Sequence, residues 1–338
     1  MSKAKTVYNI VDSIKGGCGK TTFSVLLSLV MDERAKKAAV GAGTENIKGA
    51  CLIDMDIQGT ALKYLLYGEK EKEDEQTIYL NERVSSFEED EKNYIKEFRL
   101  KNSAYGFDVI MCNPKQKEKD KYRSLATQNY SPEIMCSTFR VGFLDMIKNV
   151  QKSKSFCYEN IVFDMPPNSD GYSDAVYDCI LDGEREKTVL HEGDLCNVFI
   201  VQTMDKSQRS ASIDYALSLI REKNHINLNK IFFVFNDFLS FQMEDVDEGD
   251  FFDDAVVQVQ EAIKVESLSS EYADKIYFVG LKFVPQYYRR CTTEDGIGNL
   301  PAEEIRNVIG FVQFLRSFKG KRTVSPKTEE LLKLIMNE

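Results

Sequence analysis

The feature that most constrains this chain is the string Lys15-Gly16-Gly17-Cys18-Gly19-Lys20-Thr21-Thr22, which follows a short apolar run at Thr6–Val11. The apolar run predicts a strand, and the residues after the string have helical periodicity. Glycines let consecutive backbone N–H groups turn toward an anion, and a helix N-terminus adds positive potential. The string therefore predicts a phosphate-binding loop in which Lys20 reaches the terminal phosphates and the Thr21 hydroxyl binds Mg²⁺.

Short β-branched and aromatic runs alternate with helical segments along the rest of the chain. The predicted strands are Thr6–Val11, Ala50–Ile53, Phe107–Cys112, Asn160–Phe163, Asn197–Val201, Lys230–Phe235 and Ile276–Val284. The predicted helices are Lys20–Lys36, Gly142–Lys152, Ser173–Leu181, Ser207–Lys223, Ala255–Ser267 and Pro301–Phe318. This alternation predicts an α/β fold, a mostly parallel sheet of about seven strands with helices on both faces. We expect one ATPase domain over 1–338, with ligands bound beyond the carboxyl ends of the strands.

Composition excludes several classes of protein. The formal net charge of −10 argues against a chain that coats nucleic acid with its whole surface, although a local basic patch stays open. None of the eight cysteines forms a Cys-x-x-Cys pair, so we expect reduced thiols. The two histidines, His191 and His225, also lie far apart in sequence, so we expect no zinc or iron–sulfur site. No apolar run reaches the roughly 18 residues of a membrane span and no secretory signal is evident, so we expect a cytosolic chain.

Lys15 gives the phosphate loop its particular character. The ordinary phosphate loop has a glycine six residues before its conserved lysine, at the position where this chain has Ile14. The ordinary loop also has no lysine at the position that Lys15 occupies here, directly before the glycine pair. Lys-Gly-Gly-x-Gly-Lys-Thr-Thr resembles the deviant Walker A loop of the ParA/MinD superfamily of dimeric ATPases. The resemblance implies that Lys15 crosses a dimer interface and contacts phosphates bound by the partner subunit, as an arginine finger does. Ser13 and Ile14 depart from the Asn-x that the family often has before this lysine.

Two further motifs follow predicted strands. Asp54-Met55-Asp56 comes after Ala50–Ile53, and Asp164-Met165-Pro166-Pro167 comes after Asn160–Phe163. They resemble the family's Asp-x-Asp-x-Gln-Gly and Asp-x-Pro-Pro motifs. The resemblance implies that Asp54 and Asp164 support the magnesium shell and that Asp56 positions or activates the attacking water.

The late strands carry the predicted base-binding end. Asn236 follows Lys230–Phe235, and the amide of an Asn has the donor and acceptor that the adenine edge requires. In the family an Asn at this place binds the adenine edge and a proline-led loop packs against the base. The resemblance therefore implies that Asn236 binds adenine and that Pro285 packs against it. The chain has no Asn-Lys-x-Asp motif for guanine, so we expect ATP rather than GTP.

Four charged or amphipathic segments remain. Residues 69–101 are predicted to be a solvated helical insertion with aromatic residues packed inward, and residues 244–254, with seven acids and no base, to be an acidic loop or a contact surface for a partner. A basic cluster at the end of the last long helix contains Arg316, Lys319, Lys321 and Arg322 and is either a DNA-phosphate contact or an ordinary solvated helix end. A short C-terminal helix at 328–337 carries acids and one lysine, so core packing or a dimer contact is a better interpretation than lipid binding.

The resemblance implies an ATP-binding and hydrolysing homodimer that a centromere-binding or activator protein stimulates. We expect plasmid or chromosome partition, with the ATP dimer bound to nonspecific DNA on the nucleoid. The alternatives are a MinD-like ATPase positioned on a membrane surface and a nucleotide-dependent scaffold that turns over slowly. A metabolic synthetase of the wider superfamily fits less well, because synthetases generally lack the lysine before the glycine pair.

Overall fold

A computed structural model gives the structure of this chain. It describes residues 5–42, 47–56, 61–68, 79–82, 95–100, 106–113, 140, 142–144, 146–148, 150–151, 157–167, 171–181, 190–203, 205–221, 227–236, 248–265, 274–281, 296–300, 311–318 and 327–338.

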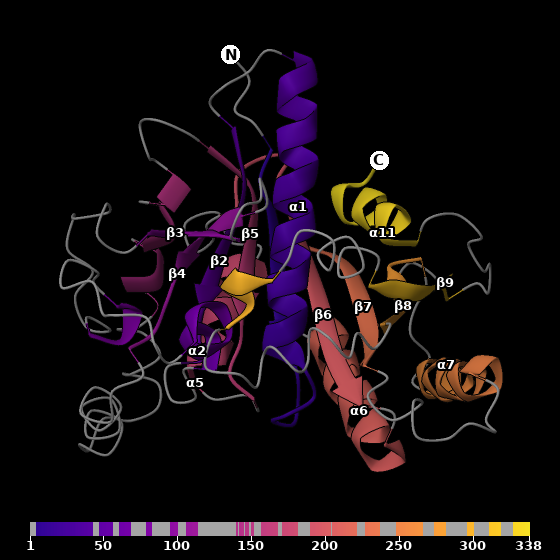
Figure 1. The fold of residues 1–338 in the computed structure, drawn as a ribbon. Helices are drawn as coiled ribbons and strands as arrows, with labels where there is room; N and C mark the ends of the chain where they lie inside the picture. Colours follow the sequence, from indigo (N-terminus) through magenta and orange to yellow (C-terminus); the bar gives the residue numbers. More distant parts are fainter. Residues whose placement is uncertain are drawn as a thin grey trace, which may run out of the picture.

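The described residues form a nine-stranded sheet in the order β3-β4-β2-β5-β1-β6-β7-β8-β9 (Figure 1). The strands are β1 (Val7–Asp12), β2 (Ile47–Asp54), β3 (Lys96–Arg99), β4 (Gly106–Ile110), β5 (Cys157–Asp164), β6 (Leu195–Thr203), β7 (Leu228–Asn236), β8 (Ile276–Leu281) and β9 (Val312–Ser317). The seven central strands pair in parallel, and the edge strands β3 and β9 are antiparallel to their neighbours. The predicted mostly parallel α/β sheet is confirmed.

Helices cover both faces of the sheet because the central strands are apolar on both sides. The α-helices are α1 (Lys20–Ala42), α2 (Ala61–Tyr67), α5 (Gly171–Leu181), α6 (Lys206–Arg221), α7 (Glu248–Val265) and α11 (Lys327–Met336), with 3-10 turns at Leu80–Glu82 and Ile297–Asn299. Along β1, Val7 and Val11 pack in the core layer that contains residues of α1, α2 and α11, whereas Tyr8 and Ile10 pack in the layer that contains residues of α5, α6 and α7. The described residues between 140 and 151 are helical, and Phe143, Met146, Ile147 and Val150 pack in the second layer.

Two sequence predictions at the edges of the sheet are wrong. The helix predicted for Pro301–Phe318 is a strand over Val312–Ser317, because these residues pair with β8. The charged insertion is not helical at Lys96–Arg99, which pairs with β4 as an edge strand, although Phe98 is buried as expected. Antiparallel edge strands contact one neighbour, so their sequences lack the continuous apolar run of a central strand. Of the same insertion, residues 69–78, 83–94 and 101 lie outside the described part of the chain.

The predicted acidic loop is also partly wrong, since residues 248–254 form the first turns of α7. Acidic side chains stabilise the beginning of a helix, where the backbone N–H groups point outward. The C-terminal residues form helix α11 over Lys327–Met336, and its apolar residues Leu331, Leu332 and Ile335 are buried in the core. None of the helices in the described ranges is long and apolar enough to cross a bilayer.

Candidate nucleotide-binding site

The phosphate loop connects the carboxyl end of β1 to the first residue of α1. Gly17 and Gly19 have φ values of +79° and +91°, in the left-handed region that favours glycine. A Cβ atom at Gly19 would lie 2.0 Å from the side-chain nitrogen of Asn236, so the third glycine is also required by a close contact. The helix begins at Lys20, and the loop therefore presents backbone N–H groups and a helix N-terminus at one edge of the sheet.

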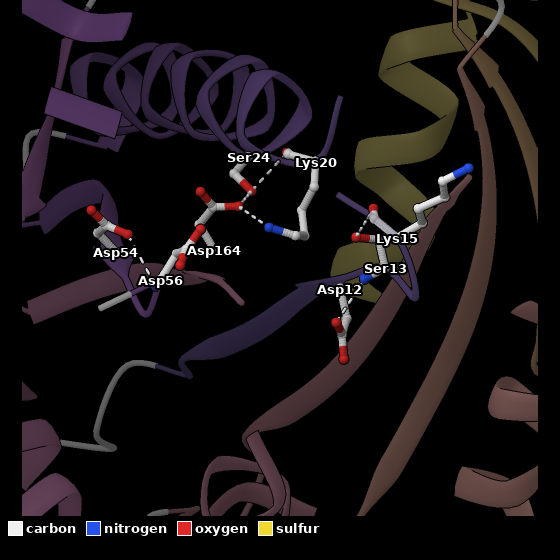
Figure 2. Close-up of polar contacts among 8 residues, drawn as sticks. All are labelled: Asp12, Ser13, Lys15, Lys20, Ser24, Asp54, Asp56 and Asp164. Carbon is white, nitrogen blue, oxygen red and sulfur yellow. Dashed lines mark hydrogen bonds and ion pairs between the residues drawn. The ribbon is translucent and has the colours of Figure 1, made fainter. Parts of the chain in front are cut away.

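Lys20 forms the electrostatic centre of the site. Its side chain is buried, and Nζ lies 3.7 Å from Oδ1 of Asp164 at the end of β5 (Figure 2). Burial lowers the pKa of Lys20, but the carboxylates of Asp164 and Asp56 outweigh it, so the pKa lies above its usual value. The ammonium group is thus held in its charged form, as binding of a phosphate requires.

Asp164 is bound from three sides by the loop and the first turn of α1. Besides Lys20, the Ser24 hydroxyl donates to Asp164 Oδ1 at 3.0 Å, and the Thr21 side chain forms a hydrogen bond with the same carboxylate. Burial raises the pKa of Asp164, and the contacts with Lys20, Thr21 and Ser24 act against this. Sequence reasoning missed Ser24, although its position one helical turn after Lys20 was a usable signal.

Asp54 and Asp56 lie next to Asp164, because Asp54 of β2 and Asp164 of β5 are register partners. Asp54 is 1% exposed, and its carboxylate accepts the N–H of Asp56 at 3.1 Å and the N–H of Cys112 at 3.3 Å. Burial, and then the charges of Asp164 and Asp56, raise the pKa of Asp54 well above its usual value. The site therefore gathers three carboxylates against one buried ammonium group, an arrangement that an added cation would stabilise.

Asn236 lies at the end of β7 and contacts the phosphate loop. Its side-chain N–H donates to the backbone carbonyl of Cys18 at 2.9 Å. One of the amide donors predicted to contact adenine is therefore bound to the loop in this structure. The predicted base-packing residue, Pro285, lies outside the described residues.

A second polar cluster, which the sequence did not reveal, lies under the start of the loop. The buried carboxylate of Asp12 accepts hydrogen bonds from Ser13 N–H at 2.6 Å, from Tyr177 Oη at 2.6 Å and from Tyr215 Oη at 2.7 Å. Tyr177 belongs to α5 and Tyr215 to α6, so Asp12 connects the phosphate loop to both helices. Burial raises the pKa of Asp12, and the three donors act against this.

Lys15 has a different orientation from Lys20. Lys15 is exposed, and Figure 2 shows its ammonium group directed away from Lys20, Asp164 and the other carboxylates. Within the described part of the chain, no ion-pair partner of Lys15 is found. This orientation leaves Lys15 outside its own phosphate site.

Arg316, one residue of the predicted basic cluster, already has an acidic partner in this structure. This residue lies on β9 rather than at a helix end, and its guanidinium group forms an ion pair of 2.6 Å with Asp253 of α7. Lys319, Lys321 and Arg322 lie outside the described residues.

The residues present fit a nucleotide with Mg²⁺. Among the described residues, no group of three or more His, Cys, Asp or Glu side chains is arranged to enclose a metal ion. Mg²⁺ at phosphate sites uses few protein ligands and keeps waters and phosphate oxygens. The hydrogen-bonded pair of Thr21 and Asp164 beside Lys20 is a donor set of this kind.

Solved structures with the same fold include two of McdA from Cyanothece. An Asp-to-Ala variant of McdA in complex with ATP has a TM-score of 0.56 at 14% sequence identity, covering 99% of this chain and 98% of that chain. Apo McdA has a TM-score of 0.51 at 13% identity, covering 97% and 99%. No protein-family model and no curated protein matches the sequence. The likeness establishes that this chain shares the McdA fold over nearly its whole length.

Proposed function

We propose that this chain is an ATPase of the ParA/MinD superfamily that pairs with a second copy of itself when ATP is bound. The observation that carries the proposal is the convergence at one sheet edge of Lys20, Asp54, Asp56 and Asp164, around a loop whose sequence has the family's extra lysine. The McdA fold supports it, since one of the McdA structures named above holds ATP.

Each residue then has a distinct role. The N–H groups of Gly16–Thr22 and the Lys20 ammonium hold the phosphates, while Thr21 and Asp164, with Asp54 behind them, support Mg²⁺. ATP and Mg²⁺ supply the phosphoryl group and the charge that neutralises its oxygens. Asp56, half-buried beside this cluster, orients the attacking water. Asn236 contacts adenine through the part of its amide that does not bind Cys18, and Pro285 packs against the base.

Lys15 acts on the partner subunit rather than on its own site. Its ammonium group points away from Lys20 and Asp164, so a single chain does not bring it to its own phosphates (Figure 2). A cation supplied by the other copy stabilises charge that develops during phosphoryl transfer. ATP occupancy and pairing are therefore coupled.

This mechanism is tested by measuring ATP hydrolysis together with the mass of the particle in solution by light scattering. Lys20→Ala abolishes nucleotide binding, Lys15→Ala binds ATP but loses hydrolysis, and Asp56→Ala accumulates as an ATP-bound pair. Lys37→Ala is the matched control, because Lys37 is an exposed lysine of α1 whose ion pair is with Glu33. A wild-type chain that stays single at saturating ATP would contradict the proposal.

For the cellular role we propose partition of DNA cargo, with nonspecific DNA as the surface on which the ATP-bound pair moves and a DNA-bound activator protein as its stimulating partner. The support is the basic group Lys319, Lys321 and Arg322 in an otherwise acidic chain. The alternative of attachment to a membrane surface through α11 has less support, because Leu331, Leu332 and Ile335 are buried within the chain.

The DNA proposal is tested by electrophoretic retardation of a nonspecific duplex with and without ATP at low salt. Neutralising Lys319, Lys321 and Arg322 weakens the ATP-dependent shift, whereas neutralising the exposed residues Lys37, Lys148 and Lys264 does not. If the wild-type chain gives no ATP-dependent shift, DNA is not the surface.

A further inference from the structure

Asp12 is a buried carboxylate that the proposed mechanism does not use. It is the last residue of β1, directly before the phosphate loop, and is 1% exposed. Figure 2 shows its carboxylate directed away from Lys20 and Asp164, so it supports neither the phosphates nor Mg²⁺. Removing a carboxylate from water is costly unless hydrogen bonds compensate the loss, so the groups that bind Asp12 indicate what it does.

The donors to Asp12 come from two helices and from the loop. Tyr177 Oη of α5 and Tyr215 Oη of α6 donate to the same oxygen, Oδ2, at 2.6 and 2.7 Å. The N–H of Ser13 donates to the other oxygen, Oδ1, at 2.6 Å. The two tyrosine rings also contact each other edge to face, with centroids 6.5 Å apart. The carboxylate is therefore anchored by two helices and holds the main chain of Ser13.

Ser13 continues this series of hydrogen bonds to Lys15. Its hydroxyl donates to the backbone carbonyl of Lys15 at 3.1 Å (Figure 2). The Cys18 thiol is also hydrogen-bonded to the Ser13 side chain. Ser13 is 1% exposed, so water competes little for these contacts. Because its N–H is bound to Asp12 and its hydroxyl to Lys15, Ser13 connects the anchored carboxylate to the main chain that carries Lys15.

Lys15 depends on its main chain more than Lys20 does. Lys20 is the first residue of α1, and its buried ammonium group lies beside Asp164. Lys15 is exposed, and a long exposed side chain samples many rotamers, so the position of its backbone determines where the ammonium group can reach. A misplacement of about 1 Å in a group that acts on the reaction can cost about 100-fold in rate.

We infer that Asp12 and Ser13 are positioning residues for Lys15, with Tyr177 and Tyr215 as the anchors of Asp12. They set the main chain from which Lys15 reaches the phosphates of the partner subunit. The inference rests on the proposed function, in which Lys15 acts on the partner's site. A fault in positioning Lys15 therefore appears at the partner's site, whereas damage to the phosphate loop as a whole appears at the chain's own site.

The first test measures ATP hydrolysis by Ser13→Ala, which removes the hydroxyl and keeps the backbone contact with Asp12. At chain concentrations that favour pairing, kcat falls about tenfold, while KM and the binding of ATP to the single chain stay within about twofold of the wild-type values. Tyr215→Phe, which removes one anchor and keeps the ring, gives the same split. Both variants are preferable to Asp12→Ala, which leaves two buried tyrosine hydroxyls unpaired.

Ser28→Ala is the matched control for Ser13→Ala. Ser28 is fully buried in α1, and its hydroxyl donates to the backbone carbonyl of Ser24 at 2.8 Å. The substitution removes the same kind of hydrogen bond away from Lys15. We expect kcat to stay at the wild-type value.

A mixing experiment determines at which site the effect of Ser13→Ala arises. Asp56→Ala has an inactive site but an intact Lys15, so in a mixed pair it supplies Lys15 to the other chain's site. Ser13→Ala is mixed with an excess of Asp56→Ala before ATP is added, so that nearly every Ser13→Ala chain is in a mixed pair. Hydrolysis per Ser13→Ala chain then rises about tenfold, back to the wild-type value, because its own site is intact and receives a correctly placed lysine.

Lys15→Ala mixed with Asp56→Ala in the same way is the positive control, and it separates the inference from the proposed function. If mixing restores Lys15→Ala but not Ser13→Ala, then Ser13 acts on its own site, the inference is overturned and the proposed function stands. Wild-type kcat in Ser13→Ala or in Tyr215→Phe also overturns the inference, as does a loss of ATP binding by the single chain that matches the loss of kcat. If mixing does not restore Lys15→Ala, the proposed role of Lys15 and the inference fail together.

Discussion

The side-chain nitrogen of Asn236 lies 2.9 Å from the carbonyl oxygen of Cys18, so the end of β7 is hydrogen-bonded to the middle of the phosphate loop. The same amide nitrogen occupies the position that a Cβ atom at Gly19 would need. Asn236 therefore stabilises the loop, in addition to its proposed contact with adenine. This double position leads to a prediction that separates the two roles.

Asn236→Ala is expected to weaken binding of ATP and also of inorganic tripolyphosphate, which has no base. The hydrogen bond to Cys18 is lost in both cases, and loss of the adenine contact affects ATP alone. We expect a reduction of about fivefold to tenfold for tripolyphosphate and a larger one for ATP. Isothermal titration calorimetry with both ligands measures this. An unchanged affinity for tripolyphosphate would limit Asn236 to base recognition.

Tyr215→Phe is expected to destabilise the chain by about 1.5–3 kcal/mol, because the hydroxyl donates to the buried carboxylate of Asp12. Tyr177 and Ser13 still bind Asp12, so the fold is retained. Urea unfolding followed by circular dichroism measures the change. Tyr64→Phe is the control, since Tyr64 is 47% exposed and its change is expected to stay within about 0.5 kcal/mol. Equal effects of the two substitutions would show that Asp12 does not need Tyr215.

Asp54→Asn is expected to change how stability depends on pH. Because burial and neighbouring carboxylates raise the pKa of Asp54 in the folded chain, its contribution is fully present below the unfolded value of 3.8 and is lost as pH rises through the folded value. The stability of the wild-type chain relative to Asp54→Asn therefore falls as pH rises above 3.8 toward the raised folded pKa. Thermal unfolding of both proteins across this range, without nucleotide or Mg²⁺, measures the slope. If the difference in stability between the wild-type chain and Asp54→Asn stays constant with pH, Asp54 does not titrate in this interval.

Leu332→Ala in α11 is expected to cost about 2–5 kcal/mol, as a large-to-small substitution at a buried position does. Leu332 is 4% exposed and packs in the core layer that also contains Phe23 of α1. Chemical denaturation gives the free energy of unfolding. Lys333→Ala, at a side chain that is 44% exposed, is the control and is expected to change it by about 0.5 kcal/mol or less. A neutral Leu332→Ala would mean that α11 is not docked in solution.

The seven strands predicted from the sequence correspond to the seven central parallel strands, with ends displaced by a few residues. The prediction succeeded there because a strand covered on both faces is apolar along its length. It failed for β3 and β9, whose edge positions are determined by the neighbouring strand rather than by their own residues. Arg316 shows the consequence, since its strand assignment brings it to Asp253 and away from a helix end.

By itself the sequence determined the phosphate loop, the order of the central strands along the chain and the carboxylates at their ends, because local spacing dictates which backbone and side-chain groups lie together after a strand. Only the tertiary structure decided that Asp12 binds Tyr177 and Tyr215 and that Ser24 contacts Asp164. It also decided that the side-chain amide of Gln202 is buried with no hydrogen-bond partner among the described residues. These relationships join residues from different elements, and no local pattern records which distant side chain will meet a given polar atom. The pairing of buried polar groups is a property of the packed fold, whereas the loop that binds phosphate is a property of eight consecutive residues.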